Sequence, residues 1–173
     1  MVEKLAAEEK QLVVFNLGQE VYAVEIAMVK EIIQMQSITR VPGTPPSIEG
    51  VINLRGTVIP IVDLRKRFKL ARIDRNKDTR VVIVSCRGQE VGVVVDSVAQ
   101  VLRVPVDSIE AAAHLFNEDK LNHVHAIVKL ASQLVILLDM DHVLTREEVN
   151  AVNSADLVKT KKTANKAKEP AAV

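Results

Sequence analysis

The four histidines are the first candidates for a metal site in this sequence. His123 and His125 would place both imidazoles on one face of a strand, because side chains two residues apart on a strand point the same way. A zinc site needs three or four ligands, and neither a cysteine nor a group of acidic residues lies near this pair in the sequence. Asp139 and Asp141 form an acidic pair, but Asp139 follows an apolar strand, a position typical of a helix cap. The sequence therefore predicts no metal site.

The sequence also lacks the motifs that mark the common enzyme classes. It contains no Gly-x-Ser-x-Gly, no Gly-x-Gly-x-x-Gly and no phosphate-binding loop. Its single cysteine, Cys86, follows Ser85 in an apolar strand with no cationic helix end predicted beside it, which indicates a buried, unreactive thiol. These absences weigh against enzymes of the commonest kinds without excluding an unusual one, and the sequence offers no candidate catalytic residue and no cofactor site.

Two charges embedded in apolar sequence could instead bind another protein. Arg55 lies at the turn of a predicted hairpin within residues 48–68, where Gly56 supplies the backbone angles that a tight turn requires. Glu31 lies in an apolar run that begins at Val29. If the fold brings Glu31 and Arg55 together, they form an ion pair on an apolar surface that would set the geometry of a partner. Otherwise both side chains project into solvent.

Composition favours a mainly-β fold. The 173 residues suffice for one ordinary domain with tails. The chain is 48% hydrophobic but only 2% aromatic and has no tryptophan, so its core must consist of Val, Ile, Leu and Ala. The β-branched residues in this core favour sheet over helix.

Charge and cysteine content indicate a soluble cytoplasmic protein. The net charge of +1 gives no overall attraction to nucleic acid or membrane. One cysteine excludes an internal disulfide and is compatible with a reducing compartment. The first ten residues lack the apolar core of a signal peptide, and no apolar run approaches the roughly 20 residues that span a bilayer.

Two predicted hairpins are alike, which indicates a repeated unit. They cover residues 13–24 and 83–94, and the shared Gly-Gln-Glu-Val begins at Gly18 and again 70 residues later at Gly88. In both copies we expect Gly and Gln to form a two-residue turn. Two copies do not suggest a solenoid, so we expect two similar small β-units, either intertwined or sequential.

The strand that follows each hairpin unit ends in an aspartate. Asp63 closes the apolar run that begins at Val58, and Asp139 closes a similar run that begins at Leu134. We expect each aspartate to cap a short helix, because its side chain can accept the free N–H groups of the first turn.

Both ends of the chain are predicted to lie outside the folded domain. Residues 1–10 form a flexible N-terminus, residues 11–150 form the domain, and residues 151–173 form a disordered tail rich in Lys and Ala.

The lysines suggest an alternative function, a β-barrel that binds nucleic acid through a basic tail, although the tail has no aromatic residue for base stacking. A second alternative is an enzyme that uses His123, His125 and a distant carboxylate on a bound metal.

Residues 53–68, NLRGTVIPIVDLRKRF, closely resemble the signature of the CheW family of bacterial chemotaxis coupling proteins. The resemblance extends from about Gln11 to about Glu148. It implies two SH3-like five-stranded β-barrels related by a pseudo-twofold, with short helices and without catalytic activity. It also implies a scaffold that couples chemoreceptors to the chemotaxis histidine kinase in signalling arrays.

The resemblance also implies partners and contact residues. The expected partners are the regulatory domain of the kinase CheA and the cytoplasmic tips of chemoreceptors, with membrane contact only through the receptors and no nucleic acid. Positions that match the family's partner contacts, without assignment to one partner, are Val29, Glu31 and Arg55 in the first half and Val98, Val101 and Phe116 in the second.

Overall fold

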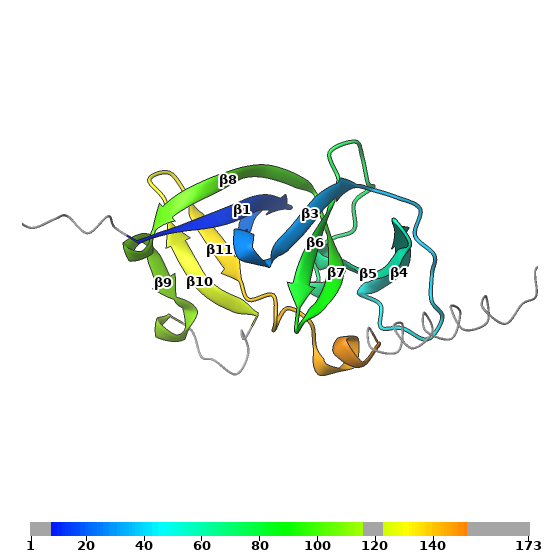
Figure 1. Cartoon of the computed structure of the whole chain (residues 1–173). Coiled ribbons are helices and arrows are strands. Elements are labelled where there is room, and N and C mark those ends of the chain that lie inside the picture. The colour runs from blue at the N-terminus through cyan, green and yellow to red at the C-terminus, as the bar shows by residue number, and fades with distance from the viewer. Residues whose placement is uncertain (1–7, 116–122, 152–173) are drawn as a thin grey trace, which may run out of the picture.

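Two small β-sheets lie side by side in the computed structural model, which describes residues 8–115 and 123–151 (Figure 1). The six-stranded sheet has the order β8-β1-β2-β11-β10-β9. Its strands are β1 (Glu9–Leu17), β2 (Glu20–Glu25), β8 (Ser97–Pro105), β9 (Ile109–Ala111), β10 (Val124–Lys129) and β11 (Leu134–Leu138). The five-stranded sheet has the order β3-β6-β7-β5-β4. Its strands are β3 (Val29–Gln34), β4 (Ile48–Leu54), β5 (Thr57–Asp63), β6 (Arg80–Cys86) and β7 (Gln89–Val95).

The helices are short, and most of them connect strands. They are the α-helix α1 (Leu64–Arg67) and the 3-10 turns η1 (Ile26–Met28), η2 (Val106–Ser108) and η3 (Ala112–His114), with a further helix at 146–151. The predicted mainly-β fold with short helices is therefore confirmed.

Both sheets repeat one strand order, which confirms the predicted duplication. In each sheet one hairpin lies between an edge strand and a second hairpin. Its pairing with the second hairpin is parallel, between β2 and β11 in one sheet and between β7 and β5 in the other. The expected count of five strands holds for one sheet. The other has six because β9 pairs with β10, where the five-stranded sheet has only an isolated bridge between Thr39 and Val51.

The two sheets are interleaved along the chain. Residues 9–25 and 97–138 supply the six-stranded sheet, whereas residues 29–95 supply the five-stranded sheet. The N-terminal hairpin therefore completes a sheet whose other strands come from the second half of the chain.

The turn of the second hairpin differs from its prediction. Gly18 and Gln19 form the β1–β2 turn as expected, with Leu17 opposite Glu20. In the β6–β7 hairpin the turn consists of Arg87 and Gly88, and Gln89 is already the first residue of β7. Both turn residues have positive φ (51° and 79°), so this is the left-handed pair that suits a two-residue hairpin. The shared Gly-Gln-Glu-Val is thus one residue out of register between the copies.

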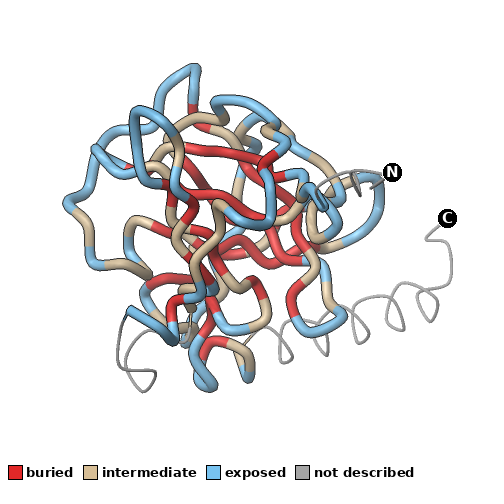
Figure 2. Tube along the Cα trace, turned by 90° about the vertical axis from the view of Figure 1, so that its left-hand side faces the viewer, coloured by how far each residue is buried: buried red, intermediate tan, exposed pale blue. Residues whose placement is uncertain are grey.

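The buried residues, most of them aliphatic, are concentrated in the interior of the molecule, where the trace in Figure 2 is red. The central core combines residues of β1, β2, β6 and β7 with residues that follow β11, and two smaller cores lie within the individual sheets. Phe15 and Leu17 are completely buried in the central core. Cys86 is buried there as predicted, and burial, with a smaller contribution from Asp141, raises its pKa to about 11.

Only one of the two aspartates predicted as helix caps has that role. Asp63 caps α1, because its Oδ1 accepts the N–H groups of Arg65 at 2.9 Å and Lys66 at 3.4 Å. Asp139 instead closes a turn, accepting the N–H of Asp141 at 3.0 Å. The helix at 146–151 begins after Thr145, whose hydroxyl accepts the N–H of Glu148 at 3.2 Å. The prediction for Asp139 was wrong because a turn with buried apolar residues precedes that helix.

Asp96 connects the two sheets. Its Oδ2 accepts the N–H of Gly18 in the β1–β2 turn at 2.7 Å, and both of its oxygens accept from the guanidinium of Arg65 at 2.6 and 2.7 Å. Burial alone would raise the pKa of Asp96, but the hydrogen bonds from Arg65 and Gly18 and the charge of Arg65 lower it overall. The ionised carboxylate therefore stabilises the folded state.

We expect Asp96 to contribute to stability only where its carboxylate is ionised. Because the folded-state pKa lies below the unfolded value of about 3.9, the contribution is complete above that pH and is lost as the pH falls through the folded-state pKa. Asp96→Asn should therefore lower the free energy of unfolding at about pH 6, and this difference should shrink toward about pH 3. Urea unfolding at both pH values tests this, with the exposed Asp107→Asn as control. A difference independent of pH would contradict the role.

Candidate functional site

The β4–β5 hairpin presents Arg55 from a rigid tip. Arg55 and Gly56 both have positive φ (51° and 86°), the conformation of a tight two-residue turn. The side-chain oxygen of Asn53 accepts the N–H of Gly56 at 2.9 Å and so closes the loop. The backbone beneath Arg55 is therefore fixed before any partner binds.

Arg55 forms a two-pronged ion pair with Glu31 of β3. Its Nη1 donates to Oε1 at 3.0 Å, and its Nη2 contacts Oε2. β3 and β4 are the two edge strands of the five-stranded sheet, so the pair joins opposite ends of that sheet. The sequence left open whether these residues meet, and the structure brings them together.

The ion pair keeps both groups charged while Arg55 stays accessible. The hydrogen bond from Arg55 lowers the pKa of Glu31, and the same bond raises the pKa of Arg55. The Arg55 side chain is 71% exposed. Such an exposed pair contributes little to stability, but it offers a partner a fixed arrangement of donors and acceptors.

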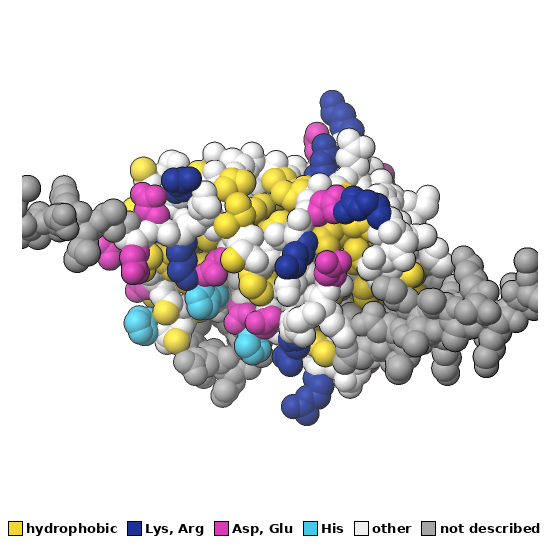
Figure 3. All heavy atoms as spheres, in the orientation of Figure 1, with side chains coloured by type: hydrophobic (Ala, Val, Ile, Leu, Met, Phe, Trp, Pro, Cys, Tyr) yellow, Lys and Arg dark blue, Asp and Glu magenta, His cyan; other side chains and the backbone are white. Residues whose placement is uncertain are grey.

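Apolar residues flank this pair on β3. Val29 packs against the central core and lies opposite Val84, and the register shifts by one residue before Glu31. Ile32, the next residue, is 39% exposed. Figure 3 shows apolar side chains exposed across the middle of this face, with charged side chains among them.

A second apolar surface lies on the edge strand β8. Val98 packs against the same central core as Val29, opposite Phe15, whereas Val101 is 51% exposed opposite Val13. A register shift between Val98 and Gln100 bends the strand at this point. Phe116, the third residue predicted in this half, lies outside the described residues.

Comparison with known proteins identifies the family. The family described as the CheW-like domain matches residues 11–148, nearly the whole described chain. The chain belongs to the CheW-like family. The resemblance read from residues 53–68 is thereby confirmed.

Relatives of this CheW-like chain match along most of its length. The chemotaxis protein CheW of Bacillus subtilis is 39% identical over 147 residues, which cover 85% of this chain and 94% of the relative. The chemotaxis protein CheW of Klebsiella aerogenes is 33% identical over 155 residues, which cover 88% of this chain and 93% of the relative. Among solved structures, the scaffolding protein TtCheW of Thermoanaerobacter tengcongensis superimposes with a TM-score of 0.75 at 35% identity, covering 82% of this chain and 96% of that one.

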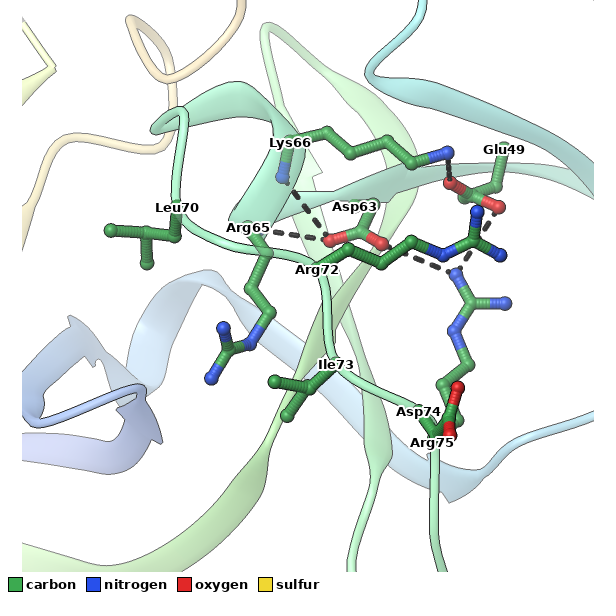
Figure 4. Close-up of a pocket in the computed structure, with 9 residues that line it drawn as sticks. All are labelled: Glu49, Asp63, Arg65, Lys66, Leu70, Arg72, Ile73, Asp74 and Arg75. Atoms are coloured by element: carbon green, nitrogen blue, oxygen red, sulfur yellow. Dashed lines mark hydrogen bonds and ion pairs between the residues drawn. The ribbon is translucent and has the colours of Figure 1, made fainter.

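A network of charges in the CheW-like fold was missed by sequence reasoning. It surrounds Glu49 of β4, which pairs with Lys66 of α1 and with Arg75 at 3.2 Å, while Arg75 also reaches Asp63 at 3.3 Å (Figure 4). Burial would raise the pKa of Glu49, but Lys66 and Arg75 lower it overall. The adjoining cavity of about 160 Å³ is lined by four basic and three acidic residues. Lys66 and Arg75 are paired with carboxylates, and these ion pairs connect the loop before β6 to α1.

His123 and His125 of the CheW-like chain do not form the metal site considered for them. His123 stacks on Phe68 with ring centroids 5.2 Å apart, and His125 is exposed at an irregularity of β10. Within residues 8–115 and 123–151, no group of three or more His, Cys, Asp or Glu could hold a metal ion. No helix in these ranges is long and apolar enough to cross a membrane.

Proposed function

We propose that this CheW-like chain is a non-enzymatic cytoplasmic scaffold that couples chemoreceptors to the chemotaxis histidine kinase CheA. The observation that carries this proposal is the Glu31–Arg55 pair, a preorganised charged group in an apolar surface. A surface of this kind suits protein recognition, because the apolar centre supplies affinity and the charges fix the register. The names of the relatives, chemotaxis proteins and a scaffolding protein, support the same function.

We infer that the chain binds its two partners through two surfaces. One contains Val29, Glu31 and Arg55 on the five-stranded sheet, and the other contains Val98 and Val101 on β8 of the six-stranded sheet. We expect each contact alone to be weak, because transient assembly needs only modest interfaces. In an array on receptors, the high effective concentration of partners multiplies such weak contacts.

Reconstituted kinase activity tests this function. We expect the purified chain to raise autophosphorylation of the kinase in receptor-containing membranes above the level without the chain, and to do so only when receptor is present. A folded chain that leaves the kinase rate unchanged would overturn the proposal. Fluorescence anisotropy of labelled nucleic acid at low salt tests the alternative function, a β-barrel that binds nucleic acid. We expect the anisotropy not to change as the chain is added.

A further inference from the structure

The two proposed partner surfaces lie at equivalent places in the internal repeat. They are the β3 surface (Val29, Glu31 and Arg55) and the β8 surface (Val98 and Val101). The β3 strand is the edge strand that pairs with β6, and β8 is the edge strand that pairs with β1. The turns that follow β1 and β6 begin after Leu17 and Cys86, so equivalent residues of the hairpins β1–β2 and β6–β7 are 69 positions apart.

The two edge strands match residue by residue. With the hairpins aligned, residues 29–32 of β3 (VKEI) pair with the same positions as residues 98–101 of β8 (VAQV), and both runs leave their second residue unpaired at a register shift. Each run begins with a valine that packs against the central core. Each run ends with an exposed aliphatic residue, Ile32 at 39% and Val101 at 51%. The apolar part of the surface is therefore the same in both copies.

The hairpin tip that carries Arg55 also has an equivalent in the second copy. Ile61 of β5 and Leu137 of β11 pair in parallel with equivalent residues of β7 and β2. Equivalent residues of the hairpins β4–β5 and β10–β11 are therefore 76 positions apart. The turn Arg55-Gly56 is thus equivalent to Ala131-Ser132, which the Leu130 N–H closes by donating to the Gln133 carbonyl at 3.0 Å.

The charged pair is absent from the second copy. Gln100 stands in the place of Glu31, and Ala131 stands in the place of Arg55. Ser132 replaces the glycine, and neither residue of this second turn has the positive φ that both residues have in the first. The second copy thus keeps the apolar part of the surface but lacks both the charges and the left-handed turn that presents the guanidinium.

The second copy has an exposed ion pair at different positions. The Nζ of Lys129 lies 3.6 Å from Oε2 of Glu110, and this pair joins the neighbouring strands β10 and β9. The equivalent of Lys129 in the first copy is Asn53, which accepts the Gly56 N–H. Because the two copies place their charges differently on the same apolar frame, a partner that fits the charges of one copy does not fit the other.

The Glu31–Arg55 pair presents mainly a cation. The Arg55 side chain is 71% exposed, whereas the Glu31 side chain is 33% exposed. The partner surface that complements this pair carries a carboxylate among aliphatic side chains. On β8 no residue from 97 to 102 is charged. The same carboxylate placed against β8 would lose water without gaining a cation, which is unfavourable.

We propose that Gln100 and the turn Ala131-Ser132 are specificity-determining residues, which keep the β8 surface from binding the partner that contacts the Glu31–Arg55 pair. That partner is a protein surface with a carboxylate among aliphatic side chains, and the chain binds one copy of it. Two identical surfaces would bind two copies of this partner and leave no place for a different one. The proposal rests on the proposed function, because coupling requires two different partners.

The first measurement identifies the Arg55-dependent partner. The receptor fragment and the kinase regulatory domain are titrated separately into wild type and into Arg55→Glu by calorimetry. We expect one of the two proteins to bind wild type as one copy per chain and to lose its binding to Arg55→Glu. A wild-type chain that binds neither protein would overturn the proposed function itself. Binding that does not depend on Arg55 would overturn only the present proposal, since no partner then contacts the pair.

The second measurement rebuilds the pair in the second copy. The variant combines Gln100→Glu, Ala131→Arg and Ser132→Gly, and all three positions are exposed. Arginine tolerates the positive φ of such a turn, as Arg55 and Arg87 show (both 51°). We expect this variant to bind two copies of the Arg55-dependent partner, and one copy when Arg55→Glu is added. A folded variant that still binds one copy, and none after Arg55→Glu, would overturn the proposal.

The matched control reverses the polarity of the rebuilt pair. It combines Gln100→Arg, Ala131→Glu and Ser132→Gly, which adds the same charges at the same positions but places a carboxylate at the hairpin tip. We expect it to bind one copy of the partner, as wild type does, because the partner's carboxylate is then repelled. Circular dichroism and the melting temperature of both variants should match wild type. Two copies bound to the control would overturn the proposal, since the added charges would then act whatever their polarity.

Discussion

Arg55→Glu should abolish receptor-dependent stimulation of the kinase while leaving the fold intact. The variant replaces the two-pronged pair with two carboxylates that face each other, at a tip that Asn53 and Gly56 hold in place. Because Arg55 is largely exposed and packs into no core, circular dichroism and the melting temperature should be nearly unchanged. Kinase autophosphorylation in receptor-containing membranes measures the loss.

Three further variants separate charge from geometry at this pair. Arg55→Lys keeps the charge but loses the two parallel hydrogen bonds, so partial coupling should remain. Glu31→Gln removes the acceptor charge and should have an intermediate effect. Combining Glu31→Arg with Arg55→Glu restores an ion pair of reversed polarity, which should not restore coupling if a partner reads the charges directly. Full coupling by Arg55→Glu would show that Arg55 does not contact a partner.

The largest loss of stability from a single methyl group is expected for Gly50→Ala. Gly50 has a φ of 142°, and a Cβ there would lie 2.1 Å from the carbonyl oxygen of Thr39. That backbone cannot move away easily, because Thr39 and Val51 exchange two hydrogen bonds of 2.8 Å. The cost should be about 3 kcal/mol or more, since overpacking adds to backbone strain. That is a large part of the roughly 5–15 kcal/mol that stabilises an ordinary domain.

Gly56→Ala is the matched control for this prediction. Gly56 also has a positive φ (86°), but nothing lies within 4 Å of a Cβ added there. Only the backbone strain of about 1–2 kcal/mol should appear. Urea unfolding measures the free energy of unfolding of both variants. Equal losses of this free energy would contradict the prediction that the close contact with Thr39 destabilises Gly50→Ala.

Local signals were predictable from the sequence. The Arg55-Gly56 turn and the Asp63 cap each depend on residues within a few positions, and both are present as expected. Local similarity gives the wrong turn in the second hairpin. The shared Gly-Gln-Glu-Val predicts a turn of Gly88 and Gln89, but the turn consists of Arg87 and Gly88, because Arg87 adopts the left-handed conformation. A shift of one residue along a strand moves each side chain to the opposite face of the sheet. The register is therefore decided by which side chains are buried, and not by a short stretch of shared sequence.

Contacts across the chain were harder to predict. Glu31 and Arg55 are 24 positions apart and meet only because the edge strands of one sheet approach each other. The bonds of Asp96 to Gly18 and Arg65 were missed, since they join three separate segments. Neither periodicity nor composition reports which segments a tertiary fold places together.

The interleaving of the two sheets has a consequence for how the chain is made. During synthesis from the N-terminus, the hairpin of residues 9–25 emerges first, but the strands that it pairs with lie in residues 97–138. The five-stranded sheet can form in the meantime from residues 29–95 alone. The first hairpin must therefore wait, with its edges unpaired and its apolar side chains Leu12, Val14 and Ala23 exposed to water, because these pack only in the core of the six-stranded sheet. We expect the ribosome-bound chain to be most prone to aggregation in this interval, and a circular permutant that begins at residue 29 and carries residues 9–25 at its end to avoid the delay.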